Sequence, residues 1–135
     1  MQRRAQPERV AAPADVAGAG LRGFVRIAEL WGLGVADQLR LLGDPARSTY
    51  YKWKGEARPQ LPRDTLERIS YVVGIYKALQ ILFPDPDRAD AWVRQPNAAP
   101  TFGGRSALQR MLSGQVADLY VVRQYVDAQL GGWPS

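Results

Sequence analysis

Apolar residues recur along this chain at the three- and four-residue spacing of amphipathic helices. No segment alternates apolar and polar residues between hairpin-type turns, as a half-buried strand would. The pattern therefore predicts an all-α protein. Asp64 or Thr65 is expected to cap the longest helix, and Pro84 to end it. Its wide apolar stripe consists of Leu66, Ile69, Val72, Val73, Tyr76, Leu79, Leu82 and Phe83.

Three shorter helices are predicted before this stripe. The first begins near Phe24, and the second covers residues 35–42, with Gly43 as a suitable C-terminal stop. Asp44-Pro45 predicts an N-cap, followed by proline at the first helical position of a third helix that ends near Gly55. Two short helices, a tight glycine turn and a third helix are the layout of a helix-turn-helix module.

Three more helices are predicted after Pro84. Asp85-Pro86-Asp87 caps a brief helix that carries Ala89, Trp92 and Val93. The two closing helices run over residues 106–112 and 116–130. Helices this short are marginal alone, so they must share hydrophobic cores. We expect one core beneath residues 24–83 and another beneath residues 92–130.

The chain is thereby divided into three parts. Residues 1–20 are rich in Ala, Pro, Gly and Arg, lack a sustained apolar period and are predicted to be a flexible tail. Residues 21–84 are predicted to form the helix-turn-helix domain. Residues 85–135 are predicted to form a small C-terminal helical subdomain.

Composition excludes several kinds of chemistry. The 135 residues include no cysteine and no histidine, so disulfides, Cys/His zinc sites, thiolate nucleophiles and imidazole bases are excluded. Asp85, Asp87 and Asp90 cluster at a predicted helix start, where capping and the helix dipole account for them. We expect no catalytic residue, metal, cofactor or small-molecule substrate. The sequence shows no signal peptide or membrane span, so we expect a cytoplasmic protein without membrane contact.

Positive charge is concentrated in the N-terminal half. Residues 1–63 hold eleven basic and six acidic side chains, whereas residues 64–135 hold seven of each. A basic half beside a neutral one indicates two tasks, one of them facing a polyanion. The later helix of a helix-turn-helix lies in the major groove, so its polar side chains are candidates for phosphate and base contacts. The predicted DNA-binding residues are Arg47, Ser48, Thr49, Lys52, Lys54 and Arg58.

The same helix has a second interpretation. A small helical domain needs a polar face, and lysine and arginine can fill it without binding DNA. Tyr50 and Trp53 are three residues apart and are expected to face the core rather than a partner. If the module does bind DNA, a homodimer is expected, because such proteins usually read paired half-sites.

The C-terminal part carries the most distinctive motif. Trp92 anchors a helix end, Pro96-Asn97 sets a turn, and Phe102 is expected to fill the core before the permissive pair Gly103-Gly104. Taken singly, each of these residues is explained by packing. A short leucine-containing helix, a stop at Gly114 and a final helix follow. This order resembles the toxin-binding domain of the Xre/MbcA/ParS antitoxin family, and the preceding residues resemble that family's upstream helix-turn-helix region. Members commonly start the short helix with proline, where this chain has Ser106-Ala107.

The resemblance implies a type II antitoxin that binds and silences a RES-domain toxin, a class that consumes NAD. It also implies that the helix-turn-helix region binds operator DNA of its own operon. In related complexes the antitoxin's C-terminal end reaches toward the toxin's active site, which makes residues 131–135 a candidate plug. The toxin-binding residues that the resemblance implies are Trp92, Asn97, Phe102, Arg105, Trp133, Pro134 and Ser135.

The sequence also allows a second function. The chain could be a stand-alone transcriptional repressor whose C-terminal helices only dimerise. That interpretation predicts tight, salt-sensitive binding of duplex DNA by the isolated chain and no toxic neighbouring gene. The antitoxin interpretation predicts a toxin gene beside this one and a stable complex between the two products.

Overall fold

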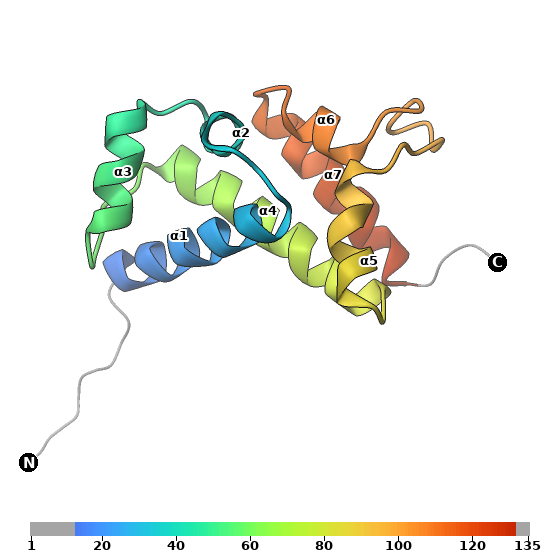
Figure 1. Ribbon diagram of the computed structural model, residues 1–135, viewed down its shortest axis with the longest axis horizontal. Coiled ribbons are helices and arrows are strands. Elements are labelled where there is room, and N and C mark those ends of the chain that lie inside the picture. Colours follow the sequence, from blue (N-terminus) through green and yellow to red (C-terminus); the bar gives the residue numbers. More distant parts are fainter. Residues whose placement is uncertain (1–12, 132–135) are drawn as a thin grey trace, which may run out of the picture.

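The computed structural model describes residues 13–131, and this part of the chain is helical, as predicted (Figure 1). The N-terminal helices are α1 (Pro13–Leu30), α2 (Val35–Leu41), α3 (Arg47–Gly55) and the long α4 (Arg63–Leu82). The remainder consists of α5 (Pro86–Ala91), the 3-10 turn η1 (Trp92–Arg94), α6 (Ala107–Met111) and α7 (Val116–Gln129).

Helix α1 starts well before the predicted position near Phe24. Residues 13–20 were expected to belong to a tail, and that expectation was wrong, because they form the first turns of this helix. Ala17 and Leu21 are buried, and they continue the three- and four-residue spacing toward Phe24. This spacing is hard to recognise in the sequence, because residues 17–20 are all alanine or glycine. At Gly18 the space is limited, since a Cβ atom there would lie 3.2 Å from the backbone oxygen of Ala57.

The turn between α2 and α3 departs from its predicted capping. Gly43 follows the end of α2 with a φ of +93°, which confirms it as the stop. Asp44 is not the N-cap of α3, because it has a φ of +59° and its side chain pairs with Arg40 at 3.1 Å. Ala46 precedes the first helical residue, Arg47, instead. Gly43 and Asp44 thus both have a left-handed backbone, and Asp44 cannot at the same time have the extended backbone of an N-cap residue.

Helix α4 also begins differently from the prediction. Pro62 is its N-cap residue, and no side chain caps this end. Asp64 lies inside the first turn, where its carboxylate accepts a hydrogen bond from Arg68 Nε at 2.9 Å. Thr65 is buried. Neither residue is therefore the cap that its position in the sequence suggested.

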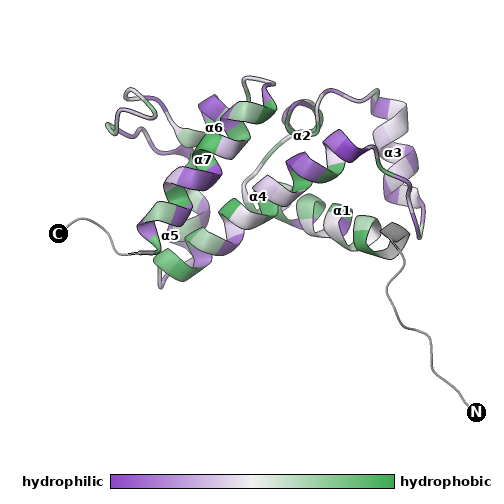
Figure 2. Cartoon of the chain, turned by 180° about the vertical axis from the view of Figure 1, so that it is seen from behind, coloured by the Kyte–Doolittle hydropathy of each residue, from purple (hydrophilic) through white to green (hydrophobic). Residues whose placement is uncertain are grey.

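One core replaces the two that were expected. Helix α4 packs against α1 and α5 and most extensively against α7, so the first and the last helix of the described residues both pack on it. Val72, Ile75 and Leu79 are almost completely buried, and the core runs without interruption from Leu21 in α1 to Val126 in α7. Helix α3 differs from these helices, since it shows pale and purple residues in Figure 2 and no strongly hydrophobic one.

Candidate functional site

Helix α3 presents polar side chains away from the core. Arg47, Ser48 and Lys52 are exposed, and Thr49 is half-buried at the edge. Tyr50 and Trp53 are 0% and 7% exposed, which confirms their predicted place in the core. The aromatic side chains therefore anchor the helix from beneath, while hydrogen-bond donors and two cations remain available on the outside. Arg58 is exposed in the loop that follows the helix.

A buried tyrosine fixes α3 relative to α2. The Tyr50 hydroxyl donates to Gln38 Oε1 at 2.7 Å, and Gln38 Nε2 donates to the backbone oxygen of Leu33 at 2.9 Å. Burial, with a smaller effect from Tyr51, raises the pKa of Tyr50 to about 12. The hydroxyl is protonated at neutral pH, and its hydrogen bond to Gln38 connects α3 to α2.

Lys54 is placed differently from the other predicted DNA-binding residues. Its Nζ lies 4.7 Å from the centre of the Tyr50 ring and 4.8 Å from that of the Tyr51 ring. Tyr51 is 48% exposed and lies on the outward face of α3, one residue before Lys52. Tyr51 is not among the predicted DNA-binding residues, although Ser48 and Tyr51 are three residues apart and so share one helix face.

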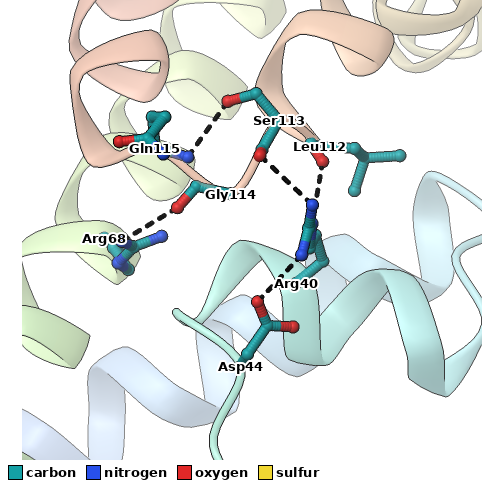
Figure 3. A network of polar contacts seen from close by, with 7 residues as sticks. All are labelled: Arg40, Asp44, Arg68, Leu112, Ser113, Gly114 and Gln115. Atoms are coloured by element: carbon teal, nitrogen blue, oxygen red, sulfur yellow. Dashed lines mark hydrogen bonds and ion pairs between the residues drawn. The ribbon is translucent and has the colours of Figure 1, made fainter.

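Arginine side chains connect the N-terminal helices to the turn between α6 and α7. Arg40 of α2 donates from Nε to the Leu112 backbone oxygen at 3.1 Å and from Nη2 to that of Ser113 at 3.3 Å. Arg68 of α4 donates from Nη2 to the Gly114 backbone oxygen at 3.2 Å (Figure 3). These three successive carbonyls lie in the turn between α6 and α7.

Two further arginines lie in the C-terminal part and donate to backbone oxygens of the N-terminal part. Arg94 of η1 donates to the backbone oxygens of Trp31 and Gly32, both at 3.0 Å, just beyond the end of α1. Arg123 of α7 reaches the Ser70 backbone oxygen at 3.4 Å. The helix-turn-helix part and the C-terminal part are therefore joined by charged hydrogen bonds as well as by a common core.

Trp92 and Phe102 lie together in an aromatic cluster with Tyr125 of α7. The Phe102 and Tyr125 rings are 4.9 Å apart edge to face, and the Trp92 and Tyr125 rings stack at 6.2 Å. Trp92 is 9% exposed and Phe102 is 5% exposed. In this conformation both side chains support the loop over residues 95–106 from inside and offer little surface to a partner.

Asn97 organises that loop through its own side chain. Its Oδ1 accepts a hydrogen bond from the Ala99 backbone N–H at 2.9 Å, the local bond expected from the sequence. Gly103 and Gly104 have φ values of +59° and +90°, which only glycine adopts readily. Arg105 follows them and is exposed. Trp133, Pro134 and Ser135 lie outside the described residues.

The part of the chain that the structure describes holds no group of three or more side chains suited to bind a metal ion. Among those residues, no helix is both long and apolar enough to cross a membrane.

Two family models match the N-terminal and the C-terminal parts of the chain separately. Residues 10–74 match the family described as the antitoxin Xre-like helix-turn-helix domain. Residues 78–132 match the antitoxin Xre/MbcA/ParS C-terminal toxin-binding domain. The two matches meet inside α4, the helix on which both parts pack.

A similar protein extends the comparison over most of the chain. The chain is 54% identical over 114 residues to the uncharacterized protein y4oB of Sinorhizobium fredii (strain NBRC 101917 / NGR234). The alignment covers 84% of this chain and 86% of that protein. With both family matches in order along one continuous core, the chain belongs to the Xre/MbcA/ParS antitoxin family.

Proposed function

We propose that this antitoxin neutralises a RES-domain, NAD-consuming toxin through its C-terminal part and binds the promoter DNA of its own operon through α3. The observation that carries the proposal is the order of the two family matches, a helix-turn-helix domain followed by a toxin-binding domain. The RES class of the toxin follows from the family resemblance, and no catalytic group of this chain is needed for inhibition.

The DNA-binding half of the proposal is supported by the outward face of α3. Arg47, Ser48 and Lys52 are exposed on it, while Tyr50 and Trp53 hold the opposite face against the core. Arginine and lysine can neutralise phosphates, and serine can donate to phosphates or base edges. Reading paired half-sites requires two copies, so we propose that the chain binds its operator as a homodimer.

The DNA interface is tested by comparing two exposed lysines. We expect Lys52→Ala to weaken binding of a promoter duplex and to lower the salt slope of log K by about 1, as for one lost phosphate contact. Lys77→Ala on α4, also exposed, should leave both quantities unchanged. Equal affinity of the two variants across a salt series would remove α3 from the interface.

The toxin-binding half includes the end of the chain. We propose that residues 131–135 enter the toxin's active site as a plug, with Trp133 as the aromatic anchor. A chain shortened after Leu130, which lacks residues 131–135, should then bind the toxin but no longer inhibit it. Full inhibition by the shortened chain would rule out the plug while leaving toxin binding by residues 78–130 intact.

Growth of cells expressing the neighbouring gene tests the function itself. The proposal predicts growth arrest by that gene alone, recovery when this chain is co-expressed, and co-purification of the two products. A neighbouring product that is harmless and does not bind this chain would point instead to a stand-alone repressor whose C-terminal helices dimerise.

A further inference from the structure

A polar pocket of about 450 Å³ lies between the loop over residues 101–105, α6 and the start of α7. It belongs to the segment that matches the toxin-binding domain. One wall is the turn whose carbonyls Arg40 holds, so the pocket has a fixed boundary. Its polar lining consists of Thr101, Arg105, Gln109, Arg110, Ser113 and Asp118.

The acidic group in this pocket is already fully engaged. Asp118 Oδ1 accepts from Arg110 Nε at 2.9 Å, and Asp118 Oδ2 accepts from the Ser113 hydroxyl at 2.6 Å. Arg110 also donates from Nη1 to the Thr101 backbone oxygen. The hydrogen bond from Ser113, together with Arg110, holds the pKa of Asp118 below its ordinary value. This aspartate is therefore ionised at neutral pH, and Arg110 balances its charge.

Arg105 provides a second cation that nothing within the described residues balances. It is exposed at the pocket rim, and its guanidinium forms no hydrogen bond or ion pair with any residue from 13 to 131. Gln109 uses its Oε1 to accept from the Ser106 backbone N–H at 2.8 Å, which leaves its amide NH₂ as a donor beside the pocket. The lining thus has an excess of one positive charge and of donors over acceptors.

We propose that this pocket receives one carboxylate of the toxin, an aspartate or glutamate side chain, bound by the Arg105 guanidinium. The inference rests on the proposed function, because the partner is the toxin that the C-terminal domain binds. A single carboxylate matches the single unbalanced charge, and guanidinium binds carboxylates with two parallel hydrogen bonds. The pocket lies in the toxin-binding segment, whereas the proposed DNA contacts lie on α3.

The test measures the affinity of the purified full-length chain for the purified toxin. We expect Arg105→Ala to weaken the complex at least tenfold and Arg105→Glu to weaken it further, because the second variant repels the carboxylate. Arg88→Ala is the matched control, since Arg88 is an exposed arginine of α5 away from the pocket lining. Circular dichroism checks that each variant is folded. An Arg105→Glu chain should regain affinity for a toxin in which the contacted acid is replaced by arginine.

The outcomes separate this inference from the function on which it rests. Loss of affinity in both Arg105 variants but not in Arg88→Ala supports the carboxylate pocket. Affinity within about threefold of wild type in Arg105→Ala overturns the pocket and leaves the antitoxin function standing. A loss of promoter binding with unchanged toxin affinity also overturns it, because it reassigns Arg105 to DNA. If the wild-type chain binds no toxin, the proposed function fails and the inference falls with it.

Discussion

Arg68 shows how one buried charge connects two parts of the molecule. It is 8% exposed, and it bonds Asp64 in its own helix and the Gly114 carbonyl across the interface with the C-terminal part. Hydrogen bonds to charged groups are stronger than neutral ones, and the half-buried Gly114 carbonyl would lose its donor. The stem of the side chain adds packing.

We therefore expect Arg68→Ala to lower the free energy of unfolding by about 2 kcal/mol. Arg26 provides the control, because its ion pair with Glu29 is formed by side chains that are 68% and 61% exposed. Arg26→Ala should cost less than about 0.5 kcal/mol. Urea unfolding of the two variants measures both values. Equal losses would mean that the contact across the interface contributes nothing.

The lowered pKa of Asp118 makes the stability of the folded chain depend on pH in the acid range. Ser113, then Arg110, holds its pKa below its ordinary value of 3.8 in the folded chain, against the opposing effect of burial. The unfolded chain then binds a proton at higher pH than the folded chain does. The stabilisation is complete above the ordinary pKa and is lost as the pH falls through the lower, folded pKa.

Asp118→Asn should remove this part of the acid dependence, and Ser113→Ala should reduce it. The measurement is the urea midpoint of each chain between about pH 5 and pH 2.5. The wild-type midpoint is expected to fall more steeply with acid than that of Asp118→Asn. Parallel curves would show that the Asp118 contacts do not favour the ionised form.

Single residues were predictable from the sequence where their contacts are local. Asn97 bonds Ala99 two residues away, and Asp85 caps α5 by accepting from the Asp87 backbone N–H, both as expected. The contacts of Arg40 and Arg68 join residues 72 and 46 positions apart, and no local pattern indicates such pairs. The packing roles expected of Trp92 and Phe102 agree with their burial, but only the structure shows that Tyr125 is their partner.

Among the elements, the turn between α2 and α3 requires a positive φ at Gly43, a conformation that residues with a Cβ atom rarely adopt. At Gly43, φ is +93°, and a Cβ atom there would lie 2.9 Å from Asp64 Oδ2 and 3.0 Å from Arg68 Nε. Gly23 is the opposite case, a helical glycine of α1 whose added Cβ would meet nothing within 4 Å.

Gly43→Ala should therefore destabilise the chain by at least about 1 kcal/mol, through left-handed strain and the displaced side chains. Gly23→Ala should instead stabilise it by about 0.5–1 kcal/mol, because alanine is the better helix former. Thermal unfolding distinguishes the two signs. A neutral Gly43→Ala variant would mean that the turn relaxes to another conformation.

The predicted elements agree with the structure where the apolar period is strong. Residues 64–83 were recognised as one long helix because Ile69, Val72 and Leu79 keep the period over many turns. The start of α1 was missed because Ala17 and Gly18 provide contact through small size rather than apolar bulk. Helix capping was misassigned at Asp44 and Asp64, whose carboxylates pair with arginines instead.

At the scale of the whole molecule, a core shared through α4 joins the two family regions, and we expect them to unfold as one unit. The sequence suggested two cores because an apolar period reveals which face of a helix is buried but not against which partner. Phe102→Ala, in the C-terminal part, should cost about 3 kcal/mol or more. We expect it to accelerate amide hydrogen exchange in α1 as much as in α7, because both open with global unfolding. Unchanged exchange in α1 would show two independent units.

We propose that this chain silences a RES-domain toxin by binding it. The most direct measurement is the rate of NAD consumption by the purified toxin as the full-length chain is added. We expect the rate of NAD consumption to fall in proportion to the added chain and to reach background once the toxin is saturated. A stable complex that still consumes NAD at the full rate, or a rate unchanged at any concentration of the chain, would contradict it.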